Sequence, residues 1–174
     1  MSTSDSSRAI GSVTRLLKEH LARCGYTSVH IGHPEDAVTS SPGSKLNLFL
    51  YEVGFDPQLK NTRVIGPASS GLWLNLKFLL TAIDQQGASE SCEALELLGG
   101  AMLALHANSV LSRDALSPGD LQSSQVSSRE SLHLSFDQNS SELVSRLLQG
   151  CARSYRTSVG FQVRAVGLAA RPRS

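Results

Sequence analysis

The residues KLNLFLYEV, at positions 45–53, decide the fold. In an extended strand their apolar side chains fall on both faces, with Leu46, Leu48 and Leu50 on one and Phe49, Tyr51 and Val53 on the other. Only Asn47 and Glu52 interrupt this apolar pattern. A strand that is apolar on both faces is typical of a sheet covered on both sides, or of an interface with another chain.

A second strand of the same kind follows at positions 72–80, LWLNLKFLL. Residues 54–71, between the two strands, are largely polar and contain several prolines and glycines. Connections within compact domains usually have about 2–6 residues, and much longer ones tend to be functional. Because no catalytic cluster lies near these strands, their pattern and the long connection favour a protein that acts as a surface for other polypeptides.

The remaining chain predicts further elements on either side of these strands. Apolar periodicity and a capping box at residues 139–142 predict helices at 7–23, at 88–108 and after residue 139. Strands are predicted at 26–31, 129–136 and 157–168, and loops at 33–44 and 116–128. This order favours one α/β (α+β) domain over residues 1–174, with an ordered core of about 8–168. Its sheet is expected to be mixed and mostly antiparallel, flanked by about three helices.

The helix predicted at 88–108 carries a pair of glycines in its middle. Its predicted buried stripe consists of Leu95, Leu98, Met102 and Leu105. Gly99 and Gly100 each destabilise a helix by about 1 kcal/mol relative to alanine. A glycine pair at this place therefore predicts the close approach of another backbone.

The composition excludes several classes of protein. The chain has 174 residues, 40% hydrophobic and 18% charged, and a net charge of +1, which gives no support for a nucleic-acid partner. The basic residues near its end, Arg164, Arg171 and Arg173, are interpreted as a solvated terminus. No apolar run reaches the roughly 18 residues of a membrane span, and the polar start lacks the core of a signal peptide. Three cysteines favour a reducing compartment. We therefore expect a cytoplasmic protein with no nucleic-acid or membrane partner.

Candidates for chemistry are few. They are His20 with Cys24, His30 with His33, and the separate thiols Cys92 and Cys151. The paired residues lack the further ligands that a metal site needs, and no acid–base partner is apparent for either thiol. The sequence thus predicts no enzyme, no metal and no cofactor. A hydrolase or transferase built on Cys92 or Cys151 remains as an alternative.

Four stretches of the chain resemble a known family. They are LNLFLYEV (46–53) with DPQLKN (56–61), LWLNLKFLLTA (72–82), LLGGAMLALH (97–106) with VLSR (110–113), and YRTSVGFQVR (155–164). In order and spacing they are similar to the N-terminal domain of the cap proteins of extracellular contractile injection systems. The chain departs from the family in its Ser- and Gln-rich residues 117–128 and at Phe161, where tyrosine is usual.

The resemblance implies a tail-terminator-like fold and a structural role. Such proteins form a ring, usually six-fold, at the distal end of a phage-tail-like particle, where they stop growth of the inner tube and hold the last ring of sheath. The implied partners are other copies of the chain, the sheath protein and the inner-tube protein. The chain is then expected to leave the cytoplasm as part of an assembled particle.

Loop length and strand pattern place the expected partner contacts on the long connection and on the exposed face of the last strand. The candidate residues are Phe55, Asp56, Pro57, Leu59, Lys60, Asn61, Arg63, Gln162 and Arg164. Two further alternatives stay open, namely a terminator of a true phage tail and a binding module that recognises one peptide without forming a ring.

Overall fold

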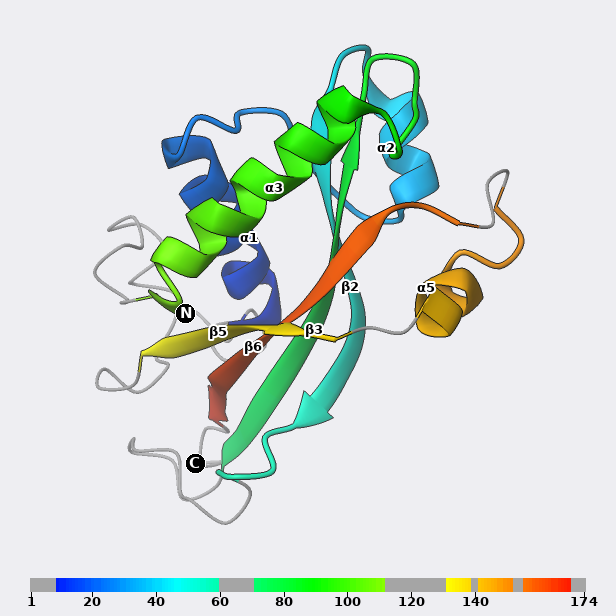
Figure 1. Cartoon of the computed structure of the whole chain (residues 1–174). Helices are drawn as coiled ribbons and strands as arrows, with labels where there is room; N and C mark the ends of the chain where they lie inside the picture. The colour runs from blue at the N-terminus through cyan, green and yellow to red at the C-terminus, as the bar shows by residue number, and fades with distance from the viewer. Residues whose placement is uncertain (1–8, 60–70, 112–130, 139–140, 152–154, 170–174) are drawn as a thin grey trace, which may run out of the picture.

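The computed structural model describes residues 9–59, 71–111, 131–138, 141–151 and 155–169 (Figure 1). One sheet with strand order β1-β2-β3-β6-β5-β4 runs through it. The strands are β1 (Val29–Ile31), β2 (Lys45–Phe55), β3 (Gly71–Ile83), β4 (Val110–Leu111), β5 (Leu132–Asp137) and β6 (Ser158–Ala169). The described helices are α1 (Ala9–Arg23), α2 (Pro34–Ser40), α3 (Cys92–Ala107) and α5 (Ser141–Leu147).

The sheet is mixed and mostly antiparallel, as the sequence predicted. Only the pair of β1 with β2 is parallel, whereas the other neighbouring strands run antiparallel. The strands predicted at 129–136 and 157–168 are present as β5 and β6. The loop predicted at 116–128 and the first residue of the capping box lie outside the described residues.

The two faces of the sheet differ in their cover. Helices α1 and α3 pack on one face, here called the helix face, and α5 lies against the opposite face (Figure 1). Leu46 and Leu48 belong to the large core on the helix face, while Phe49 and Tyr51 pack with the core of α5. The prediction that this strand is covered on both faces is therefore confirmed for residues 46–51, whereas Val53 and Phe55 beyond them are exposed.

A β-bulge changes the facing of the last residues of β2. The register with β3 shifts between Leu50 and Glu52, so that Val53 lies opposite Leu76 and Phe55 opposite Leu74. Residues directly opposite each other share a face, and both leucines belong to the core of the helix face. The prediction that Val53 shares a face with Phe49 is wrong, because a bulge inserts one residue and reverses the alternation.

The segment predicted as a loop at 33–44 contains α2. Pro34 occupies the start of this helix, where its fixed φ suits the first turn and its missing N–H is not needed. Nδ1 of His33 accepts a hydrogen bond from the backbone N–H of Glu35 and so caps the helix. At the other end, Nζ of Lys45 donates to the carbonyl oxygens of Ala37 and Ser41. Pro34 therefore marks the start of a helix, and the prediction of a loop at these residues was wrong.

Helix α3 begins later than predicted, at Cys92. The carboxylate of Asp84 accepts hydrogen bonds from the N–H groups of Gln86 and Ala88, which holds the preceding residues in a turn. Ser91 then caps the helix by accepting from the N–H of Ala94. The buried stripe consists of Ala94, Leu98, Ala101 and Leu105. Leu95 was predicted to be buried but is 45% exposed.

One glycine of the pair in α3 faces a side chain, and neither glycine faces the backbone of another element. A Cβ built on Gly100 would lie 2.3 Å from the hydroxyl of Tyr26, whereas a Cβ on Gly99 would meet nothing within 4 Å. The close approach that the sequence predicted is thus made at one glycine only, and by the tip of a tyrosine.

The two glycines form a matched pair for a stability experiment. We expect Gly99→Ala to raise the free energy of unfolding by about 0.5–1 kcal/mol, because alanine favours the helix and has room. Gly100→Ala is expected to lower it, because Tyr26 must move. Urea denaturation followed by circular dichroism measures both values. Tyr26→Phe should remove most of the difference between them, and equal effects in the wild-type background would contradict the contact.

Candidate partner-binding site

The predicted contact residues lie at the end of β2 and on the adjoining part of β6. Phe55, the last residue of β2, is 66% exposed, and Pro57 beyond it is also exposed. Asp56 is 0% exposed and Leu59 is half-buried. Lys60, Asn61 and Arg63 lie outside the described residues. The structure therefore divides this set into exposed side chains and one buried carboxylate.

The Asp56 carboxylate joins the connection after β2 to strand β6. Its Oδ1 accepts from Nη2 of Arg164 at 2.9 Å, and its Oδ2 accepts from Nε of the same guanidinium at 3.2 Å. Oδ2 also accepts from the backbone N–H of Ala165 at 3.3 Å. The N–H groups of Gln58 and Leu59 donate to Oδ1 at 2.9 and 3.3 Å. Such a fully satisfied buried carboxylate positions its neighbours and has no surface of its own to offer.

Ala165 shows why β6 needs this support. Its φ is +62°, a left-handed conformation that costs a residue with a Cβ about 1–2 kcal/mol. The strand is irregular here, since the register between β3 and β6 shifts between Leu74 and Leu76. After the shift, Val166 points into the core of the helix face. Asp56 therefore binds both residues of the bulge, Arg164 through its side chain and Ala165 through its backbone N–H.

The hydrogen bonds also set the protonation of the pair. Burial alone raises the pKa of Asp56, but hydrogen bonds from Arg164 and from the N–H groups of Gln58 and Ala165 outweigh burial and bring this pKa below its ordinary value. The hydrogen bond to Asp56 raises the pKa of Arg164. Both residues are therefore charged at neutral pH.

This shift predicts a specific loss of stability in acid. The pKa of Asp56 is lower in the folded chain than in the unfolded chain, where it is about 3.9. The stabilisation is then complete above about pH 5 and is lost as the pH falls through the folded-state pKa. Urea denaturation at a series of pH values from 6 to about 2.5 should show this loss in the wild type. The difference between wild type and Asp56→Asn should shrink over the same range, and a constant difference would contradict the assignment.

A row of polar side chains crosses the sheet next to this ion pair. Glu52, Lys77, Gln162 and Ser135 lie opposite one another on β2, β3, β6 and β5, on the face away from α1 and α3. Nζ of Lys77 lies 2.9 Å from Oε1 of Glu52. The amide of Asn75 donates to Oε1 of Gln162 at 2.7 Å. Gln162 and Arg164, both predicted contact residues, are half-buried here and already have partners within the chain.

Sequence reasoning missed the apolar residues of this region. Val53, Phe55 and Leu72 are exposed, although each lies on the helix face, whose other residues form the core. Only Phe55 was among the predicted contacts. The sequence feature that could have identified them is their position next to the long connection. There, α1 and α3 no longer cover the sheet.

A model of the family described as the Pvc16 N-terminal domain matches residues 10–173 of the chain. The chain belongs to this family. The resemblance inferred from the sequence is thereby confirmed. A comparison with curated proteins found no match.

Two solved structures share the fold of this Pvc16 N-terminal domain chain. One is the PVC sheath/tube terminator of an extracellular contractile injection system in its extended state, with a TM-score of 0.62, 16% identity and coverage of 94% of this chain. The other is the tube-terminating cap of the anti-feeding prophage, with a TM-score of 0.55, 16% identity and the same coverage. The chain spans 57% and 54% of the length of these two proteins.

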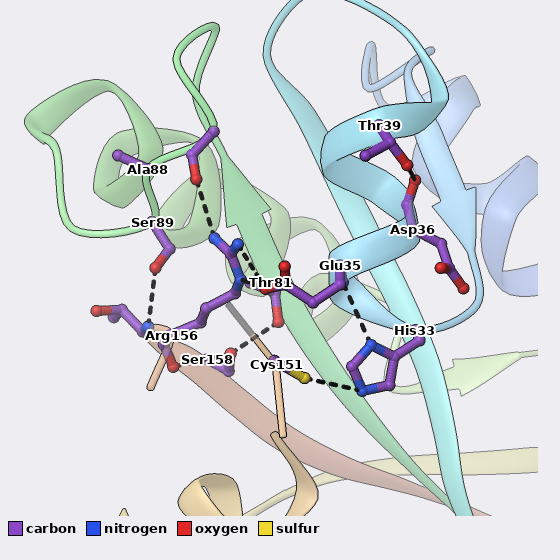
Figure 2. A network of polar contacts seen from close by, with 12 residues as sticks. His33, Glu35, Asp36, Thr39, Thr81, Ala88, Ser89, Cys151, Arg156 and Ser158 are labelled. Carbon is purple, nitrogen blue, oxygen red and sulfur yellow. Dashed lines mark hydrogen bonds and ion pairs between the residues drawn. The ribbon is translucent and has the colours of Figure 1, made fainter. Parts of the chain in front are cut away.

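Figure 2 shows a second polar cluster, at the opposite end of β6. The guanidinium of Arg156, only 2% exposed, donates to Oε1 of Glu35 at 2.8 and 3.1 Å and to the carbonyl of Gly87 at 2.9 Å. The N–H of Thr157 donates to Oγ of Ser89 at 3.2 Å. This cluster joins α2, the turn before α3 and the start of β6, which identifies it as a structural junction of the Pvc16 N-terminal domain.

The same figure places Cys151 beside His33, with 3.7 Å between Sγ and Nε2. Nδ1 of His33 accepts from the N–H of Glu35, so the neutral ring carries its proton on Nε2 and presents a donor to the sulfur. Burial raises the pKa of the Cys151 thiol, and the negative charge of Glu35 raises it further. A cysteine nucleophile needs a thiolate and a base that accepts its proton, whereas here Nε2 of His33 donates to the sulfur and the pKa of the thiol is raised.

The histidine candidates His20 and His30 also have structural contacts. Nε2 of His20 lies 3.3 Å from the carbonyl of Ala104 and 3.9 Å from Sγ of Cys24. Nδ1 of His30 lies 2.8 Å from Oδ1 of Asn47. Within the described ranges, no group of three or more His, Cys, Asp or Glu residues is placed to hold a metal ion. None of the helices in those ranges combines the length and apolar character needed to cross a membrane.

Thiol reactivity gives a direct check on Cys151. We expect iodoacetamide at pH 7.5 to modify the exposed Cys24 and Cys92 before the half-buried Cys151, whose raised pKa leaves little thiolate. Mass spectrometry of tryptic peptides over time measures the three rates. If Cys151 reacts fastest, the cysteine-enzyme alternative must be taken up again.

Proposed function

We propose that this chain is a structural cap, or terminator, of a phage-tail-like contractile injection particle, and that it carries out no catalysis. In this role it forms a ring, six-fold as in its family, which ends the growth of the inner tube and holds the last ring of sheath. One observation carries the proposal: 94% of the chain has the fold of two proteins that are described as tube terminators.

The geometry of the partner-binding site supports a docking role. Asp56 fixes the start of the long connection to β6, while Phe55 and Pro57 on either side of it are exposed. Because the start of the connection is held in place beside exposed apolar side chains, it is suited to binding another polypeptide without reordering the domain. The partners are then copies of the same chain together with the sheath and inner-tube proteins. The chain is made in the cytoplasm and becomes part of the particle.

Tube length tests the proposal. Cells that lack this chain but make the other particle components should give tubes of irregular length in negative-stain images, whereas complementation with the wild-type chain should restore one length. The assembled ring should have a mass near six times 18.6 kDa. Tubes of normal length in its absence would refute the terminator role, and a small, soluble species that only binds one peptide would favour the peptide-binding alternative.

A deletion tests the docking role of the connection. Removing residues 60–68 while keeping 56–59 preserves the N–H groups that donate to Asp56. We expect this variant to keep the circular dichroism spectrum of the wild type but to be missing from purified particles. The matched control replaces 60–68 with glycine and serine at the same length, which separates the effect of the side chains from that of chain length. Normal incorporation of both variants would exclude contacts by this connection.

A further inference from the structure

The outer edge of β2 lacks a strand partner over much of its length in the part of the chain that the structure describes. Strand β1 pairs only with residues 46–48 of β2. The N–H of Asp56 donates to the carbonyl of Trp73 on β3, so Asp56 points inward. Strand alternation then directs the backbone N–H and C=O groups of Val53 and Phe55 outward. Natural sheets usually shorten, charge or cover such an edge, because it can add another strand.

This edge is also apolar on one side. The side chains of Val53 and Phe55 are 49% and 66% exposed, and both lie on the helix face. Neither a lysine nor a proline blocks the edge between residues 49 and 55. The outward polar groups and the apolar side chains together favour a partner strand whose own apolar side chains lie on the helix face.

The opposite edge of the same sheet carries such a strand. β4 covers β5 only at Leu132 and His133, and the N–H of Leu134 donates to the carbonyl of Ser109. By alternation, the backbone groups of Phe136 also point outward, beyond the end of β4. The ring of Phe136 lies on the helix face, 6.1 Å from that of Phe161, whereas Ser135 lies on the polar side.

We propose that the open edge of β2 in one copy pairs with the open edge of β5 in the next copy, with Phe55 beside Phe136 of the neighbouring copy. The occupant is a second copy because β5 matches β2 in facing and in direction. Strands β2, β3, β6 and β5 alternate in direction, so copies with their helix faces on the same side bring β5 antiparallel to β2. The joint is heterologous, as a closed ring requires. This inference rests on the proposed ring-forming function and names the surfaces that form the ring.

The positions of β1 and β4 determine how the copies are offset. With Phe55 opposite Phe136, the neighbour's β4 lies beyond the end of β2, and β1 lies beyond the end of the neighbour's β5. The short edge strands therefore flank the joint without occupying it.

The same offset gives a strand tilt that agrees with the tilt found in sheets that close on themselves. The row through Phe136 crosses β3 at Phe78, and the row through Phe55 crosses it at Leu74. Four residues are about 13 Å along a strand, and four strands are about 19 Å across. The strands would tilt by about 35°, at the lower end of the roughly 35–45° that allows a sheet to close on itself. The offset of the joint is therefore compatible with closure of the sheet into a ring.

Two substitutions at one position test the edge in assembled particles. Val53→Pro removes the outward N–H that would lie opposite Gln138, the residue that follows β5 in the neighbouring copy. β2 keeps its bonds to β3 because those use inward groups. Val53→Thr keeps that N–H and serves as the matched control. We expect the proline variant to be at least tenfold depleted from purified particles and the threonine variant to be incorporated normally. Thermal unfolding of both isolated chains checks that they fold.

Cross-linking gives a second, independent measurement. In a background with Cys24, Cys92 and Cys151 replaced by serine, particles containing a mixture of Phe55→Cys and Phe136→Cys chains should form disulfide dimers of about twice 18.6 kDa on oxidation. Particles with either variant alone should not. Dimers from Phe55→Cys alone, or normal incorporation of Val53→Pro, would overturn the inference and leave the terminator role intact. Absence of the wild-type chain from particles would overturn the proposed function itself.

Discussion

Replacing Asp56 by alanine is expected to lower the free energy of unfolding by about 3 kcal/mol. Removing one partner of a buried ion pair usually costs about 3–5 kcal/mol, and the lower end applies because Arg164 is partly exposed to solvent. The substitution removes the acceptor for the guanidinium and for the N–H of Ala165, at a bulge with a left-handed residue. Equilibrium urea denaturation followed by tryptophan fluorescence and circular dichroism measures the loss.

A double-mutant cycle separates the ion pair from the backbone contacts. Arg164→Met alone leaves the buried Asp56 with its three backbone donors, so the loss should be smaller than that of Asp56→Ala. The double variant should be more stable than the sum of the two losses predicts, because the residues are in contact. A loss below about 1 kcal/mol for Asp56→Ala would show that the carboxylate does not support the bulge.

The substitution Glu35→Ala is expected to cost about 3–5 kcal/mol. It removes the carboxylate that pairs with the guanidinium of Arg156, whose side chain is 2% exposed. The carbonyl of Gly87 then remains as its acceptor, and an uncompensated charge is left in the interior. Thermal and urea denaturation should both show this loss.

The matched controls at this junction keep its volume. Glu35→Gln keeps an acceptor oxygen and should lose less than Glu35→Ala. Arg156→Met removes the charge, and in combination with Glu35→Ala it should restore part of the stability lost in the single variant, because no buried charge is left without a partner. Equal stability of Glu35→Ala and wild type would mean that solvent reaches the guanidinium.

The regular strands could be predicted from the sequence because their pattern is local. The two-faced apolar run of β2 and the alternation in β5 follow from strand geometry alone. The bulges could not be predicted, since inserting one residue leaves composition and periodicity almost unchanged and yet reverses the facing of Val53. Helix α2 was missed because its short sequence, with proline first, also fits a loop.

The candidate site could be predicted only in part. Its location after β2 followed from the length of the connection, but the buried role of Asp56 did not. Its partner Arg164 is 108 residues away, and an aspartate before a proline is ordinarily a turn residue in solvent. The particular residues of β2 and β5 that lie at open edges could not be predicted, because they depend on how far β1 and β4 extend in three dimensions.

The irregularity at Ala165 has a consequence for how the chain reaches its native state. If the bulge did not form, β6 could pair regularly with β3 in a register shifted by one residue. This shift would turn Val166 away from the core and expose it. The hydrogen bond from the N–H of Ala165 to Asp56 belongs to the bulged pairing, so we expect Asp56 to favour this pairing over the competitor during refolding. Loss of that carboxylate should therefore reduce the yield of native protein and increase aggregation even where the surviving native molecules remain stable.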